Sequence, residues 1–103
     1  MRPMSVYAVA LIDIQDREQY GKYERGFLPI FEKFGGKLLA VEEEPVVREG
    51  SWPAQRTVLF EFASQEAFDH WYDSAEYQEL VKLRLGSSQG NIAVLRGFAA
   101  GVD

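Results

Sequence analysis

The chain has 103 residues, of which 47% are hydrophobic and 14% aromatic, and its formal net charge is −5. This length allows one small hydrophobic core, so a single domain over residues 1–103 is expected. A chain with net negative charge is repelled by nucleic-acid phosphates and by anionic membrane surfaces, which argues against both as partners. The absence of cysteine excludes disulfides and thiolate chemistry.

The apolar run 6–14 is the early segment that has to be tested as a targeting or membrane signal. It is far shorter than the roughly 20 apolar residues that span a bilayer. It follows a single basic residue, and no small-residue cleavage pattern comes after it. We therefore interpret the run as a strand and expect a soluble, cytoplasmic protein.

The first part of the chain predicts a strand followed by a helix. Residues 6–14 are apolar on both faces of the expected strand. A helix is expected over 17–34, with Asp16 as its N-cap and apolar residues at steps of three and four. Pro29 lacks the backbone N–H that the helix needs, which predicts a kink or a break just before it. The glycines at 35–36 are expected to end the helix.

The rest of the chain predicts three further strands and two further helices. The expected strands are 37–44, 55–63 and 91–98, with a loop over 46–55. Ser64 and Ser74 are expected to cap two short helices, and Gly86 to end the second. Residues 99–103 are expected to fray.

This element order is β-α-β-β-α-β, which predicts an α+β fold with a ferredoxin-like antiparallel sheet and its helices on one face. The first and third strands would then be central. Both strands carry apolar residues on both sides, so the face without helices needs a cover. A second copy of the chain is the simplest cover, which predicts a homodimer.

Several short motifs are spread over nearly the whole chain. They are Asp16-x-x-x-Tyr20-x-x-Tyr23, Gly35-Gly36, Glu49-Gly50-x-Trp52-x-x-x-Arg56, Glu61-Phe62-x-Ser64, Ala67, Trp71-Tyr72-x-Ser74-x-x-Tyr77-Gln78 and Arg84. Jointly they resemble domain-of-unknown-function family 1330, in the dimeric α/β-barrel group of ferredoxin-like folds. The resemblance implies a homodimer enclosing a barrel-like core, a cleft between sheet and helices, and no assigned activity.

The chain departs from the family pattern at two places. Residues 41–43 are Val-Glu-Glu where an Arg-Gly-Gly step is usual, and Ala63 stands where proline is common. The first departure would change the rim of a pocket. The wider superfamily includes cofactor-free monooxygenases, muconolactone-isomerase-like proteins and dye-decolourising haem enzymes, so the fold by itself implies no particular chemistry.

Glu61 is the candidate catalytic residue. It lies between two phenylalanines on an expected central strand, where loss of hydration would suit it to general acid or base use. The alternative is a structural ion pair with Arg96. Asp13 and Arg56 are expected to form a similar cross-strand pair at the opposite end of the sheet.

Candidate ligand-binding residues are aromatic and cationic side chains of the helices and the third strand. They are Tyr20, Arg56, Trp71, Tyr72 and Arg84. Aromatic residues can line a pocket for a flat ligand, although they more often fill the core. An Arg84 guanidinium without a protein partner would indicate an anionic substrate. Pairing of Arg84 with Glu49 or Asp73 would instead indicate a structural role.

The remaining polar residues predict neither a metal nor a cofactor. His70 shares an expected helix face with Glu66 and Asp73, but one histidine beside two carboxylates is more often solvated than metal-bound. Ser64 and Ser74 are explained as caps, and no nucleophilic triad can be built. Two functions therefore stay open: an enzyme without cofactor that acts on a small acidic or aromatic compound, and a non-catalytic binding or structural homodimer.

Overall fold

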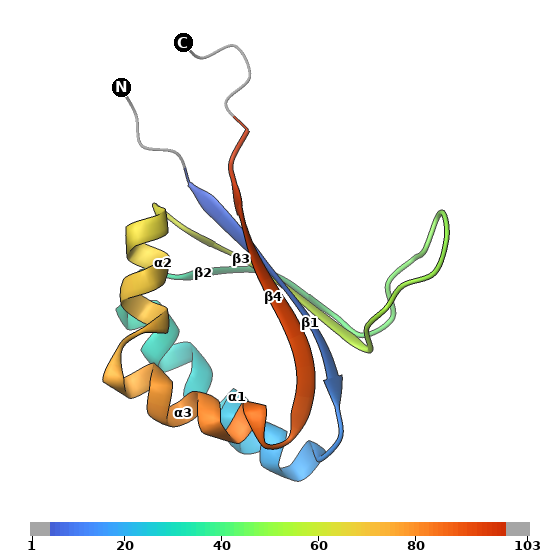
Figure 1. The fold of residues 1–103 in the computed structure, drawn as a ribbon, viewed down its shortest axis with the longest axis horizontal. Helices are drawn as coiled ribbons and strands as arrows, with labels where there is room; N and C mark the ends of the chain where they lie inside the picture. The colour runs from blue at the N-terminus through green and yellow to red at the C-terminus, as the bar shows by residue number, and fades with distance from the viewer. Residues whose placement is uncertain (1–4, 99–103) are drawn as a thin grey trace.

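The computed structural model describes residues 5–98, and the predicted fraying of 99–103 lies outside this range. The elements are β1 (Val6–Ile14), α1 (Arg17–Lys33), β2 (Lys37–Glu42), β3 (Arg56–Phe62), α2 (Gln65–Tyr72), α3 (Ala75–Leu85) and β4 (Ser88–Arg96). They form a four-stranded antiparallel sheet with the helices on one face (Figure 1). This confirms the predicted α+β, ferredoxin-like arrangement. No helix within the described range is long and apolar enough to cross a membrane.

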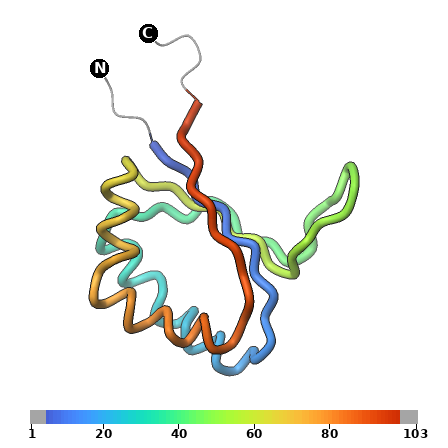
Figure 2. The backbone as a smooth tube through the Cα atoms, viewed as in Figure 1, coloured from blue at the N-terminus to red at the C-terminus, as the bar shows by residue number. Residues whose placement is uncertain are grey.

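The strand order is β2-β3-β1-β4, so the first and third strands are central, as predicted. β1 pairs with β3 from Val6 opposite Phe62 to Ile12 opposite Arg56. Along β1 every second side chain is buried toward the helices, because side chains of a strand alternate between its two faces. The segment between β2 and β3 extends away from the sheet and helices (Figure 2).

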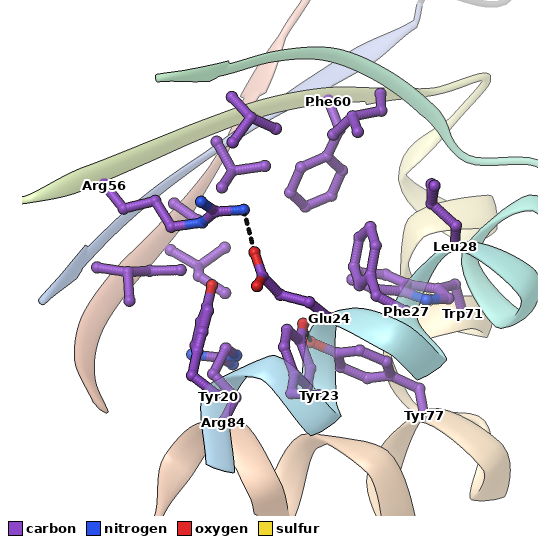
Figure 3. Close-up of a pocket in the computed structure, with 16 residues that line it drawn as sticks. Tyr20, Tyr23, Glu24, Phe27, Leu28, Arg56, Phe60, Trp71, Tyr77 and Arg84 are labelled. Atoms are coloured by element: carbon purple, nitrogen blue, oxygen red, sulfur yellow. Dashed lines mark hydrogen bonds and ion pairs between the residues drawn. The ribbon is translucent and has the colours of Figure 1, made fainter. Parts of the chain in front are cut away.

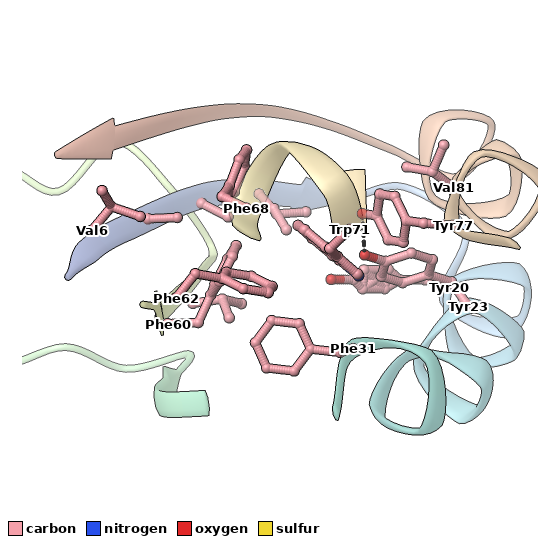
Figure 4. Close-up of a cluster of buried hydrophobic side chains, with 14 residues drawn as sticks. Val6, Tyr20, Tyr23, Phe31, Phe60, Phe62, Phe68, Trp71, Tyr77 and Val81 are labelled. Carbon is pink, nitrogen blue, oxygen red and sulfur yellow. Dashed lines mark hydrogen bonds between the residues drawn. The ribbon is translucent and has the colours of Figure 1, made fainter. Parts of the chain in front are cut away.

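The core lies between the sheet and the helices and is built mainly from aromatic rings (Figure 4). Phe31 of α1 is fully buried. Its ring meets Phe60, Phe62 and Trp71 edge to face, at centroid distances of 5.3, 5.3 and 5.5 Å. Edge-to-face pairs stabilise by about 0.5–1.5 kcal/mol beyond the burial of their area. These contacts therefore tie α1, β3 and α2 together.

The three predicted helix N-caps are confirmed. Asp16 Oδ1 accepts a hydrogen bond from a backbone N–H in the first turn of α1 at 3.1 Å. Ser64 Oγ and Ser74 Oγ accept in the same way at the starts of α2 and α3, each at 3.1 Å. Such a cap contributes about 1 kcal/mol to helix stability. The Ser74 cap receives its hydrogen bond from the N–H of Tyr77, a residue that lines the cavity described below.

Of the predicted kink or break just before Pro29, the break does not occur, because α1 continues through this residue to Lys33. The rings of Phe27 and Phe31 stack across the proline, with centroids 4.7 Å apart and planes at 22°. Both rings also pack against Trp71, so side-chain burial holds the two parts of the helix together. Tertiary packing therefore outweighs the hydrogen bond that proline removes.

β4 begins at Ser88, three residues before the predicted start at 91. The carbonyl of Ser87 accepts hydrogen bonds from the N–H groups of Gln15 and Asp16, at 2.8 and 3.0 Å. These bonds bring the chain alongside the end of β1 immediately after α3. Pairing with a central strand therefore outweighs the turn tendency of the serine and glycine residues here.

The face of the sheet away from the helices carries apolar side chains. Tyr7, Val9 and Leu11 of β1 lie on it beside Leu59 of β3, and all four are half-buried. Leu95 of β4 lies next to Tyr7 and is 54% exposed. Both faces of the central strands are thus apolar, as the sequence predicted.

The contact between Gly36 and Phe31 provides a stability test. A Cβ atom on Gly36 would overlap the buried Phe31 ring. We expect Gly36→Ala to lower the free energy of unfolding by about 1–3 kcal/mol, because the packed ring cannot move aside freely. The control is Gly21→Ala in α1, where the nearest atom is the flexible Arg25 Nη1 at 3.6 Å. It should raise stability by roughly 0.5–1 kcal/mol. Urea denaturation measures both, and equal effects would contradict the proposed contact.

Candidate functional site

A cavity of about 180 Å3 lies between the sheet and the helices (Figure 3). Its deep part is lined by buried aromatic residues, namely Tyr20, Tyr23, Phe60, Trp71 and Tyr77. Its exposed lining residues are Glu24 and Leu28 of α1 and Leu38 and Val41 of β2. The opening therefore lies between α1 and β2. This is the cleft between sheet and helices that the sequence resemblance implied.

Arg84 lines this cavity and is only 4% exposed. Within residues 5–98 it forms no ion pair with a carboxylate, and its Nε has no hydrogen-bond partner in the protein. Its Cζ lies 5.9 Å from the centre of the Tyr23 ring. Removing a guanidinium from water costs several kcal/mol when no counter-ion accompanies it. The fold thus buries one cation that it does not neutralise.

The charge of Arg84 persists despite its burial. Burial by itself acts to lower the pKa of Arg84, whereas the oxygens of Tyr77 and Tyr23 act to raise it. The net shift of the pKa is upward. The side chain is therefore a permanent cation at the wall of the cavity.

Arg56 also lines the cavity, but its guanidinium has two carboxylate partners. One is Glu24 of α1, and the other is Glu43, whose Oε2 lies 2.8 Å from Arg56 Nη1. The predicted pair of Arg56 with Asp13 is wrong. Asp13 instead accepts a hydrogen bond from the N–H of Gln55 at 2.9 Å. Arg56 thus connects β3 to α1 and to the segment after β2.

Two tyrosines of the cavity are hydrogen-bonded to each other. The hydroxyl oxygens of Tyr23 and Tyr77 lie 2.7 Å apart and are buried. Burial raises the pKa of both phenols, so they are uncharged at neutral pH. One hydroxyl donates to the other, and the proton of the accepting hydroxyl remains available to a ligand. Burial also raises the pKa of Tyr20, against the opposing effect of Arg56.

Hydrogen-bond donors without a partner are concentrated at this cavity. Among the described residues, three buried side-chain nitrogen or oxygen atoms lack a partner in the protein: Arg56 Nε, Trp71 Nε1 and Arg84 Nε. All three residues line the cavity. Leaving such a group unsatisfied costs about 1–3 kcal/mol, so native proteins rarely keep one without a reason. Protein atoms shield all three nitrogens from solvent, so they lie behind the wall of the cavity and are not donors that a ligand reaches directly.

The structure brings together four of the predicted site residues, since Tyr20, Arg56, Trp71 and Arg84 all line the cavity. Tyr72 does not line it. Its ring stacks on Phe68 instead, with centroids 5.8 Å apart and planes at 11°.

Glu61 is separated from this group because it projects from the opposite face of the sheet. On β3 the flanking Phe60 and Phe62 point to the helices, and Glu61 lies opposite Tyr7 of β1 and Lys37 of β2. No ion pair between Glu61 and Arg96 occurs among the ion pairs of the described chain. The catalytic role of Glu61 stays a prediction, and the cavity offers it no place.

Glu24 is the site residue that sequence reasoning missed, and it is the acidic side chain of the cavity lining. It comes four residues after Tyr20, a spacing that places both on one face of α1. This spacing was the available signal. An exposed glutamate on a helix usually faces only solvent, so nothing in the local pattern distinguished Glu24 from the other acidic residues of α1.

The described residues contain no group of three or more histidine, cysteine, aspartate or glutamate side chains placed to hold a metal. His70 is exposed, and its ring lies 5.2 Å from that of Phe34. The polar side chains that line the cavity are therefore those of arginine, tyrosine, tryptophan and one glutamate.

The two arginines should respond oppositely to neutral substitution. Arg84→Met removes a buried cation without a counter-ion, so we expect the free energy of unfolding to rise by about 1 kcal/mol. Arg56→Met leaves Glu24 without its partner and Glu43 with Arg17 alone, and should lower the free energy of unfolding by about 1 kcal/mol. Both are measured by urea denaturation at one fixed protein concentration. A loss of stability in Arg84→Met as large as in Arg56→Met would mean that Arg84 is a structural residue.

Several solved structures are similar in fold to this chain, among them the following three. A protein of unknown function from Rhodopseudomonas palustris aligns with a TM-score of 0.80 at 21% identity, over 95% of this chain and 85% of that one. SnoaB, a cofactor-independent oxygenase from Streptomyces nogalater, aligns with a TM-score of 0.67 at 11% identity, over 97% and 99%. A dimeric ferredoxin-like protein of unknown function from Thermobifida fusca aligns with a TM-score of 0.63 at 11% identity, over 94% of each chain. At these identities the likeness concerns the fold alone.

Among proteins with curated descriptions, none matches this chain. The sequence profile described as Domain of unknown function (DUF1330) matches residues 5–98, which is nearly the whole chain. The match agrees with the motifs that carried the resemblance in the sequence. The chain therefore belongs to the DUF1330 family.

Proposed function

We propose that the cavity binds a small organic acid, with Arg84 as its anion-binding residue. The observation that carries this proposal is the burial of Arg84 at the cavity wall without a carboxylate partner. A guanidinium presents a planar fork of N–H donors that matches the two oxygens of a carboxylate. A bound acid would supply the counter-ion that the protein does not.

The alternative, a purely structural role, fits Arg56 better than Arg84. Arg56 has two carboxylate partners and connects three parts of the chain. Arg84 pairs neither with Glu49 nor with Asp73, the two residues that a structural role would have required. The two arginines of one cavity thus support different roles.

The cavity also supports acid–base chemistry without a cofactor. Glu24 at the opening is positioned to accept a proton from a carbon next to a carbonyl group. The free hydroxyl proton of the Tyr23–Tyr77 pair can form a hydrogen bond to the oxygen that gains the charge, while Glu24 holds the abstracted proton and later returns it to the carbon. The similarity in fold to SnoaB supports this class of chemistry only by analogy. The proton-accepting role therefore passes to Glu24 in this proposal.

The binding part is tested with monocarboxylates from propionate to benzoate by isothermal titration calorimetry. We expect at least one acid to bind, and Arg84→Met to weaken its binding by at least about tenfold, because the charge-assisted hydrogen bonds are lost. The matched control is Arg48→Met, since Arg48 is an exposed arginine of the loop before β3. It should bind like the parent protein. Absence of binding by the whole series, or equal binding by Arg84→Met, would refute the proposal.

The chemical part is tested on an acid that binds and carries an exchangeable C–H next to a carbonyl. NMR in D2O should show deuterium entering at this carbon. Glu24→Gln keeps the size of the side chain but cannot take up the proton, so exchange should fall while binding persists. If Glu24→Gln exchanges as fast as the parent protein, the residue is not the base.

We also propose that the chain works as a homodimer through the apolar face of the sheet, as the dimeric state of the Thermobifida fusca relative supports. The single domain and the cytoplasmic location expected from the sequence stay predictions. Sedimentation at low micromolar concentration should show a dimer, and Leu59→Lys should dissociate it by placing a charge in the buried face. Leu85→Lys on the exposed side of α3 is the control and should stay dimeric. A monomeric parent protein would contradict the dimer.

A further inference from the structure

We infer that the ligand is a planar, singly charged acid about the size of one aromatic ring. This inference rests on the proposed function, because it takes Arg84 as the residue that binds the carboxylate. It adds a size limit, a shape and a charge. Each follows from a different feature of the cavity.

The size limit comes from the volume of the cavity, about 180 Å3. An engineered apolar cavity of roughly 150 Å3 in another protein binds benzene. The present cavity therefore holds one six-membered ring with small substituents. Two fused rings would exceed it unless they extended through the opening between α1 and β2.

The shape comes from rings that stand nearly perpendicular to one another. The rings of Phe27 and Phe60 meet that of Trp71 at 88° and 77°, with centroids 6.1 and 5.6 Å apart. All three residues line the cavity. Aromatic side chains rotate about few bonds and favour flat partners in stacked or edge-to-face contact. A flat ring is therefore favoured over a puckered one of equal size.

The single charge comes from the count of partners around the two arginines. Arg56 is already paired with Glu24 and Glu43. Arg84 has no carboxylate partner among the ion pairs of residues 5–98. One positive charge at the cavity is thus left without a counter-charge, which matches a monoanion. A second buried negative charge on the ligand would be costly.

The test uses three probe acids on the full-length protein, measured by titration calorimetry. They are benzoate, cyclohexanecarboxylate and 2-naphthoate. We expect benzoate to bind most tightly, and the puckered and fused acids to bind at least about tenfold more weakly than benzoate.

The outcomes separate this inference from the proposed function. Equal affinity for cyclohexanecarboxylate or 2-naphthoate would overturn the inference. If aliphatic acids alone bind and Arg84→Met abolishes that binding, the inference fails while the proposed function stands. If none of these acids and no other small carboxylate binds, both fail.

Discussion

The packing of Trp71 is the contact on which both the core and the cavity depend. Its ring meets Phe31 of α1 and Phe62 of β3 on the core side, and Tyr77 of α3 on the side of the cavity. A ring that is 1% exposed and surrounded by other rings has little freedom to rotate. The same side chain therefore joins the helices to the sheet and holds one wall of the cavity in a constant shape.

The position of Arg84 illustrates how a fold can carry a charge that weakens it. The Ser74 cap starts α3, and the carbonyl of Arg84 accepts a hydrogen bond from Ser88 Oγ at 2.7 Å near its end. The backbone at Arg84 is thus firmly held, and the side chain follows it into the cavity. We expect a methionine there to raise stability, and a cost of this kind is common where a fold supports a binding residue, the role that we propose for Arg84.

The two faces of the sheet differ because side chains alternate along a strand. On β3, Phe60 lines the cavity, whereas its neighbours Leu59 and Glu61 point to the face without helices. The proposed ligand site and the proposed dimer contact therefore lie on opposite sides of the same four strands. This separation also explains why Glu61 and Arg84, both selected from the sequence, do not meet.

Local sequence patterns determined much of the secondary structure of this protein. Apolar alternation predicted the strands, and Asp16, Ser64 and Ser74 predicted the helix starts, because both signals act between residues close in the chain. The sequence also indicated that the partner of Arg84 would distinguish a binding role from a structural one. It did not indicate which partner Arg84 has. Only the tertiary structure decided that Arg84 lacks a carboxylate partner among residues 5–98, that Glu24 lies at the opening and that α1 passes through Pro29. These outcomes depend on contacts between distant segments, and no periodicity within one segment encodes them.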